Sequence, residues 1–176
     1  MLTKVLKLST IGIFLLPSLL LAQGTILQAN EDALFLEGLD LFDKEKYSAS
    51  QRIFQTYLDS EGDYSREKSI QATFYTAICA LKIGSTDFES QVTSFIRRYP
   101  SHPKAKEAYF YLGSHYFDKG DYPRAMEYFS NYNLQSIQNS GDAEAAYKLA
   151  YTYFALKQYE EAVQLFDVVK KTNSEY

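Results

Sequence analysis

The sequence predicts an all-α protein in which four helical hairpins stack into a solenoid. Three observations predict this fold. Apolar side chains recur with helical spacing through residues 31–171, a similar hairpin pattern returns every 36 to 39 residues, and no stretch alternates in the manner of a β-strand. A single hairpin would leave one apolar face uncovered, so the four copies have to lie against one another.

The third copy, residues 108–132, shows the pattern most clearly. Its apolar positions are Tyr109, Leu112, Gly113 and Tyr116 in the first helix, and Tyr122, Ala125, Phe129 and Tyr132 in the second. Gly120 ends the first helix, because glycine tolerates the left-handed conformation there, and Asp121 caps the second. Gly113 and Ala125 are small, which lets the two helices approach closely.

This pattern resembles the tetratricopeptide repeat, a helix-turn-helix of about 34 residues with the motifs large-x-x-Leu-Gly-x-x-Tyr and Gly-x-Tyr-x-x-Ala-x-x-x-Phe. The stretch FIRRYPSHPKAKEAYFYLGSHYFDKGDYPRAMEYF is similar to bacterial cell-envelope members of the family, including outer-membrane assembly proteins. The resemblance covers about residues 31–171. It implies that the stack is a right-handed superhelix and that the protein acts by binding other proteins.

The other copies follow from sliding this pattern along the chain, with Gly38, Ala77 and Ala150 in the place of Gly113. Pro100 and Pro103 separate the fourth helix from the fifth, since proline fits only the first turn of a helix. We expect helices at about 31–43, 46–58, 67–83, 87–98, 104–118, 122–131, 142–156 and 159–171. They pair into repeats at about 31–58, 67–98, 104–132 and 142–171.

The N-terminal stretch has the features of a secretory signal peptide. Lys4 and Lys7 precede an apolar run from Ile11 to Ala22, which Pro17 interrupts. A membrane span needs about 20 apolar residues, and this run is shorter. We therefore expect residues 1–22 to be removed, leaving a short segment, 23–30, before the solenoid of an exported, periplasmic or cell-envelope protein. An uncleaved N-terminal anchor is the alternative. Attachment of a lipid to a cysteine at the cleavage point is excluded, because none is there.

Composition narrows the class of partner. The formal net charge is −4 and no basic run is present, so nucleic acid and anionic membranes are poor partners. Any contact with a membrane would come through the signal peptide or through other proteins. The single cysteine, Cys79, cannot form an internal disulfide, and its apolar surroundings on a helix indicate an inert packing residue.

The chain shows no pattern of an enzyme. His102 and His115 lie thirteen residues apart and outside the spacings of metal ligands. The acidic pairs, Glu31 with Asp32 and Glu160 with Glu161, stand at helix starts, where the helix dipole favours anions. No phosphate loop, nucleophile elbow or dinucleotide motif occurs. We predict no catalytic residue, no cofactor and no metal.

A candidate binding site lies on the inner face of the first helices. An aromatic residue stands three positions before each small position, and a further apolar residue follows seven positions later. These two rows, with one tyrosine between them in the last copy, are Phe35, Phe42, Phe74, Leu81, Phe110, Phe117, Tyr147, Tyr151 and Phe154. Such rows would line a concave groove that accepts peptide segments through aromatic anchors. In the alternative interpretation they only pack against the neighbouring first helices.

The charges at the start of each first helix indicate which charge a partner would carry. These positions hold Asp32, Gln71, Glu107 and Glu144. Members of the family that read chaperone tails use Lys, Arg and Asn there to hold a carboxylate, and three acids would repel it. The acids would favour a partner with Lys or Arg flanking an apolar core.

The end of the sequence, KKTNSEY, gives no closing helix, and residues 172–176 look like the start of another connector. We expect either that the chain continues into further repeats or that the open end self-associates. The function expected is a non-enzymatic scaffold of the cell envelope that binds proteins. The alternatives are a recognition module of a larger envelope protein or enzyme, and a glycan or small-molecule binder that uses the aromatic groove.

Overall fold

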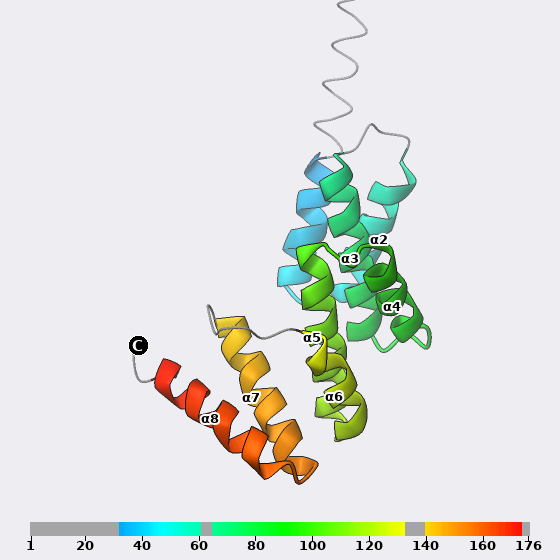
Figure 1. Cartoon of the computed structure of the whole chain (residues 1–176). Coiled ribbons are helices and arrows are strands. Elements are labelled where there is room, and N and C mark those ends of the chain that lie inside the picture. The colour runs from blue at the N-terminus through cyan, green and yellow to red at the C-terminus, as the bar shows by residue number, and fades with distance from the viewer. Residues whose placement is uncertain (1–31, 61–64, 133–139, 174–176) are drawn as a thin grey trace, which may run out of the picture.

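The computed structural model describes residues 32–60, 65–132 and 140–173. The predicted signal peptide and the segment 23–30 lie outside these residues, as does most of the predicted final connector. All regular secondary structure in the described ranges is helical (Figure 1). Over the same ranges, every helix is too short or too polar to cross a membrane.

The helices follow one another as antiparallel neighbours. The first helix is described over residues 32–43, and seven more follow it: α2 (Tyr47–Asp59), α3 (Arg66–Lys82), α4 (Phe88–Arg98), α5 (Pro103–Asp118), α6 (Tyr122–Ser130), α7 (Ser140–Ala155) and α8 (Tyr159–Asn173). Their described bounds agree with the predicted ones to within two residues. Figure 1 shows the hairpins in chain order, with α7 and α8 at the end of the array opposite the first helix. The prediction of an all-α repeat fold is confirmed.

The first helix of every hairpin ends in the same way. A residue with positive φ follows it, and the next amide donates to the carbonyl five residues back, which satisfies carbonyls that the helix leaves free. These residues are Glu45, Gly84, Gly120 and Lys157, and the four amide-to-carbonyl distances are all 2.9 Å. Gly120 was predicted in this role. Glu45 and Lys157 were not predicted, because neither is the glycine that this conformation favours.

Within the first and third hairpins, a phenyl ring lies directly on the backbone of the facing helix. A Cβ atom at Gly113 would come within 2.5 Å of Cδ1 of Phe129, and one at Gly38 within 2.8 Å of the ring of Phe54. Both phenylalanines are almost completely buried. Next to Gly38, the Ser50 hydroxyl donates a hydrogen bond of 2.8 Å to the Gly38 carbonyl. The small residues therefore make room for a ring as well as for a close helix approach.

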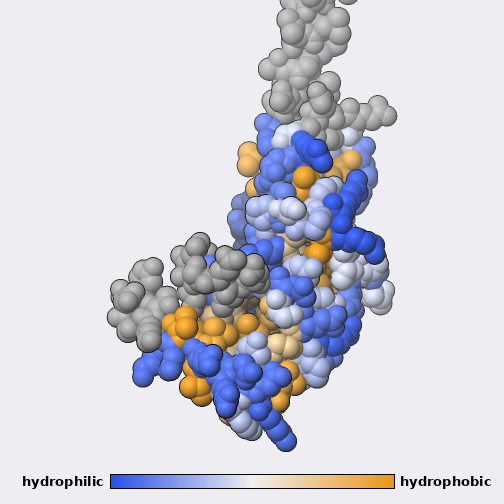
Figure 2. All heavy atoms as spheres, in the orientation of Figure 1, coloured by the Kyte–Doolittle hydropathy of each residue, from blue (hydrophilic) through white to orange (hydrophobic). Residues whose placement is uncertain are grey.

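The hydrophobic core runs along the chain as three clusters. The first joins the first helix, α2 and α3 around Phe54 and Tyr57, the second joins α3, α4 and α5 around Phe74, and the third joins α5 and α6 around Phe129. The first two clusters extend into the next hairpin. At the other end, Figure 2 shows hydrophobic side chains gathered on the surface over α7 and α8.

A polar cluster joins α4 to the next hairpin. The carboxylate of Glu89 accepts hydrogen bonds from the hydroxyls of Tyr116 (2.8 Å) and Tyr128 (2.6 Å), and from the guanidinium of Arg124 (2.6 Å). The same guanidinium lies 4.0 Å from the ring centroid of Tyr116. Burial alone would raise the pKa of Glu89, but the three donors outweigh it and lower the pKa. Burial and the bond to Glu89 together raise the pKa of Tyr116 to about 12, so its hydroxyl stays a donor.

We expect Gly113→Ala to destabilise the protein by about 1–3 kcal/mol, because the added methyl overlaps the buried ring of Phe129. At an open position inside a helix, the same change would stabilise the protein by about 0.5–1 kcal/mol. Urea unfolding of the two proteins measures the sign. An unfolding midpoint above that of the wild type would show that the ring does not occupy this space.

Candidate functional site

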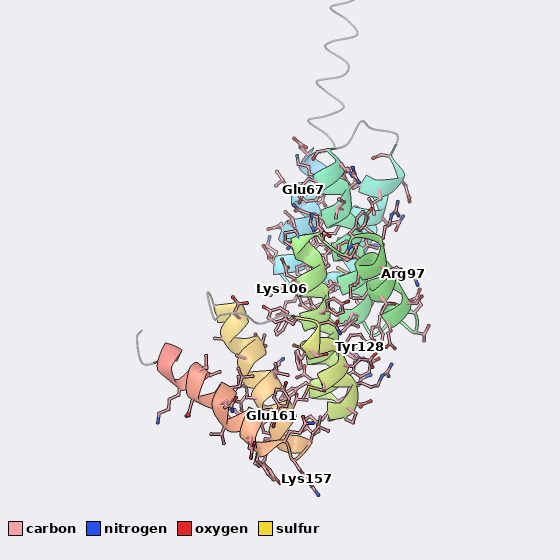
Figure 3. The ribbon with its side chains drawn as sticks, viewed as in Figure 1. Glu67, Arg97, Lys106, Tyr128, Lys157 and Glu161 are labelled. Carbon is pink, nitrogen blue, oxygen red and sulfur yellow. The ribbon has the colours of Figure 1, made fainter. Side chains whose placement is uncertain are left out.

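The first helices of successive hairpins enclose a groove. A cavity of about 390 Å³ lies between α3, α5 and α7. Its lining residues are Leu81, Lys82, Phe110, Tyr111, Ser114, His115, Asp118, Glu144 and Lys148. Figure 3 shows Lys106 of α5 on the side of that helix that faces α7, whereas Arg97 and Tyr128 lie on the side away from α7 and α8. We call the cavity and its lining residues the inner groove.

Aromatic rings and lysines alternate along the inner groove. The Lys82 ammonium lies 5.4 Å from the ring centroid of Tyr111, and the Lys148 ammonium lies 5.8 Å from that of Phe110. Lys148 also pairs with Glu144 at 3.1 Å and with Asp118 at 3.7 Å. Two cations and two anions thus border the rings, and the local charge is balanced.

Two polar atoms of the inner groove make no hydrogen bond within the described residues, namely Oγ of Ser114 and Nε2 of His115. The His115 ring packs against Phe88, with the ring centroids 4.5 Å apart. Burial, with Lys119 acting in the same direction, lowers the pKa of His115, so the imidazole is neutral at neutral pH. Burial, with Glu107 as the second cause, raises the pKa of Tyr111 to about 12, so its hydroxyl keeps its proton.

The nine predicted groove residues fall into three groups along the chain. Phe35, Phe74 and Leu81 are buried, with at most 6 % of the residue exposed; Phe42, Phe110 and Phe117 are partly buried; and Tyr147, Tyr151 and Phe154 are exposed. Phe35, Phe74 and Leu81 are therefore interior packing residues. The exposure of the rows is greatest in the last hairpin.

Most of the inner groove was not among the predicted site residues. Leu81 and Phe110 were, whereas Lys82, Tyr111, Ser114, His115, Asp118 and Lys148 were not. One available signal was helical spacing, because Ser114 lies four residues after Phe110, and Asp118 four residues later again. The lysines come from neighbouring helices, and no spacing within α5 could have indicated them.

The acids at the starts of the first helices each lie beside a lysine. Asp32 pairs with Lys68 at 2.5 Å, Glu107 with Lys104 at 2.8 Å, and Glu144 with Lys148 at 3.1 Å; Gln71 donates to Glu67 at 2.8 Å. That these acids repel a partner's carboxylate, and that they favour a basic partner, stay predictions.

His102 and Cys79, the other side chains that could react, take part in the packing and capping of helices. Nδ1 of His102 accepts the amide of Lys104 at 3.1 Å and so caps α5, while its Nε2 faces Glu67 at 3.2 Å. Cys79 is completely buried, as predicted, and burial raises the pKa of its thiol. Among the described residues, no group of three or more His, Cys, Asp and Glu side chains could hold a metal ion.

The sequence of this region matches a known family. Residues 95–169, somewhat under half of the chain, match the family model described as "Anaphase-promoting complex, cyclosome, subunit 3", a family with tetratricopeptide-like repeats. This match and the helical-hairpin fold together support a repeat protein of the tetratricopeptide type. The match runs from the end of α4 into α8 and so includes two of the three helices that border the inner groove. Neither the curated proteins nor the solved structures gave a match. Tetratricopeptide-like repeats generally mediate protein–protein interactions, which makes a protein-binding scaffold the general function of such a chain.

We expect His115 to make stability depend on pH below 6.5. The unfolded state takes up a proton as the pH falls through about 6.5, but the folded state resists it, so the free energy of unfolding decreases with falling pH. The slope from one such site is at most about 1.4 kcal/mol per pH unit. Urea unfolding of the wild type and His115→Gln between pH 7.5 and 5.5 measures it.

Three carboxyl groups also have a lowered pKa, namely Glu67, Asp87 and Glu89. They change the free energy of unfolding mainly below about pH 4.5, which lies outside the measured range of pH 7.5 to 5.5. The variant should lose less stability than the wild type across the window. The same loss in both proteins would contradict the role of His115.

Proposed function

We propose that this protein is an exported scaffold that binds a segment of a partner protein in the inner groove. The observation that supports the proposal most is the combination of aromatic rings, balanced charges and the two polar atoms of Ser114 and His115 that make no hydrogen bond among the described residues. Both atoms are buried, and buried polar groups normally have hydrogen-bond partners, so a polar group of a segment that enters the cavity would supply the partner that they lack.

The chemistry of the inner groove suggests the kind of segment. Its volume of about 390 Å³ is in the range of small binding sites, enough for a few side chains. The rings of Phe110 and Tyr111 would hold an apolar anchor, and Ser114 and His115 would bind its polar neighbours. Lys82 and Lys148 lie beside Asp118 and Glu144. A strongly charged segment would therefore gain little binding free energy from these four side chains. The preferred segment is therefore amphipathic and close to neutral.

Binding without catalysis fits the inner groove better than an enzymatic role. Ser114 and His115 are the residues that resemble a nucleophile and a base, but they are neighbours in one helix. Adjacent side chains on a helix point about 100° apart and do not face each other. His115 is thus poorly placed to take a proton from Ser114. Tetratricopeptide-like families are generally non-enzymatic scaffolds, which agrees with this interpretation.

We further propose that the scaffold works in the periplasm or elsewhere in the cell envelope. The support is the N-terminal sequence, in which Lys4 and Lys7 precede the apolar run that ends at Ala22. Cell fractionation followed by N-terminal sequencing tests this. We expect the exported protein to begin at Gln23. A chain that stays in the cytoplasm with residues 1–22 attached would refute export.

Site-specific photo-crosslinking tests the inner groove. A benzophenone amino acid at Asp118 or Glu144, whose side chains are 67 % and 55 % exposed, should form adducts with a partner in an extract of the cells that make the protein. The controls are Arg97 and Glu127, which are exposed and border a different cavity beside α4 and α6. They should give no such adduct. If the partner adducts are the same from both pairs of positions, binding does not occur in the inner groove.

A further inference from the structure

The junctions between hairpins share one contact. At each junction, a lysine from the next hairpin lies over the aromatic ring that stands three residues before the small position. The three pairs, with their distances from the lysine nitrogen to the ring centroid, are Lys68 over Phe35 (6.0 Å), Lys104 over Phe74 (4.9 Å) and Lys148 over Phe110 (5.8 Å). A cation over a ring face is attracted by the electrons of the ring, the more strongly where water is excluded.

Two further groups complete this contact. At the first junction, Asp32 lies one turn before Phe35 and binds the same lysine, Lys68, at 2.5 Å. At the third junction, Lys148 lies over Phe117 as well (5.7 Å), and Tyr151, three residues after the lysine, packs edge-on against the Phe117 ring at 5.5 Å. The helix that covers this hairpin therefore brings a lysine with an aromatic residue three positions later.

The last hairpin presents the same groups without a cover. A shift of 37 residues moves Phe110, Phe117 and Tyr122 onto Tyr147, Phe154 and Tyr159. The first three are partly buried beneath α7, whereas 49 %, 53 % and 54 % of the last three, in the same order, are exposed. We call Tyr147, Phe154 and Tyr159 the end face.

The end face also has an acid, but its rings have no cation. Glu144 lies one turn before Tyr147, as Asp32 lies before Phe35, and its side chain is 55 % exposed. Among the residues that the structure describes, no lysine or arginine lies over the ring of Tyr147 or of Phe154. The ring and the acid that hold a lysine at the first junction are thus repeated here, with Glu144 already paired with Lys148 of its own helix at 3.1 Å.

We propose that the end face binds an amphipathic helix of a partner protein, one that carries a lysine followed three residues later by an aromatic residue. The lysine lies over Tyr147 within reach of Glu144, and the aromatic residue packs against Phe154 and Tyr159. The lysine over a ring continues a contact of the three internal junctions, and the aromatic residue three positions later continues one of the third junction. It uses residues other than those of the inner groove, apart from Glu144, which borders both.

The charges disfavour a second copy of this chain as the occupant. In head-to-tail stacking, the first helix of one copy would cover the end face of another. Over residues 32–43 that helix has no lysine, and Glu37, Asp40 and Asp43 are exposed on it. These acids would approach Glu144, and like charges across an interface oppose association.

A peptide that copies α7, residues 140–155, is a direct probe, because it carries Lys148 and Tyr151 in the required spacing. The labelled peptide is titrated with the full-length protein up to about 1 mM, and binding is followed by fluorescence anisotropy. We expect saturable binding. Tyr147→Ala in the protein should weaken it about tenfold or more, and Lys148→Gln in the peptide by about threefold to tenfold. The control Leu36→Ala removes a more exposed apolar residue, 62 % exposed against 49 % for Tyr147, from the first helix and should leave binding unchanged.

A charge exchange distinguishes this specific contact from non-specific hydrophobic association. Tyr147→Lys in the protein should abolish binding of the peptide that has Lys148, and Lys148→Glu in the peptide should restore part of it. Absence of binding at 1 mM, or binding that Tyr147→Ala leaves unchanged, would overturn the proposal. So would a concentration-dependent dimer of the free protein that Tyr147→Ala dissociates, because a second copy would then be the occupant. Crosslinking at Asp118 reports on the inner groove separately from these measurements, because Asp118 does not belong to the end face, whereas Glu144 borders both.

Discussion

Each hairpin of this protein can cover only one side of its own apolar surface, and the rest of the structure depends on how the other side is covered. The ring of Phe129 on Gly113 closes the inside of the third hairpin, and that of Phe54 on Gly38 closes the inside of the first. The outside is closed by the next hairpin, as when Phe74 packs in a cluster with residues of α4 and α5. Stability in such an array comes from the hairpins and from the junctions between neighbours.

Polar contacts give these junctions a defined geometry. Apolar contact has no direction, so two helices could slide along each other at little cost. The carboxylate of Glu89 restricts this, because it has to meet Tyr116, Tyr128 and Arg124 at once. The lysines over Phe35, Phe74 and Phe110 act in the same way on the inner side. These directional contacts help to set the register of the helices.

The fold could be predicted almost completely from the sequence, and the site only in part. Helix positions follow from local periodicity and from turn residues such as Gly120 and Asp121, and both signals lie within a few residues. The inner groove depends on which side chains from different hairpins meet. Phe35 and Phe110 occupy equivalent positions, yet one is buried and the other lines a cavity, because different neighbours cover them. The pairing of Asp32 with Lys68 could not be foreseen either, since 36 residues separate them, whereas Glu107 and Glu144 pair with Lys104 and Lys148 within one turn of their own helices.

The order of contacts along the chain has a consequence for how the protein forms. From α2 to α8, the described helices contact only the next helix or the one after it. The mean sequence separation of contacting residues is therefore small, and little chain entropy is lost before a contact is gained. Proteins of this kind fold rapidly, and folding can begin at any unit and spread to its neighbours. A chain that emerges from a ribosome or a translocation channel could thus assemble its early hairpins before the later ones have arrived.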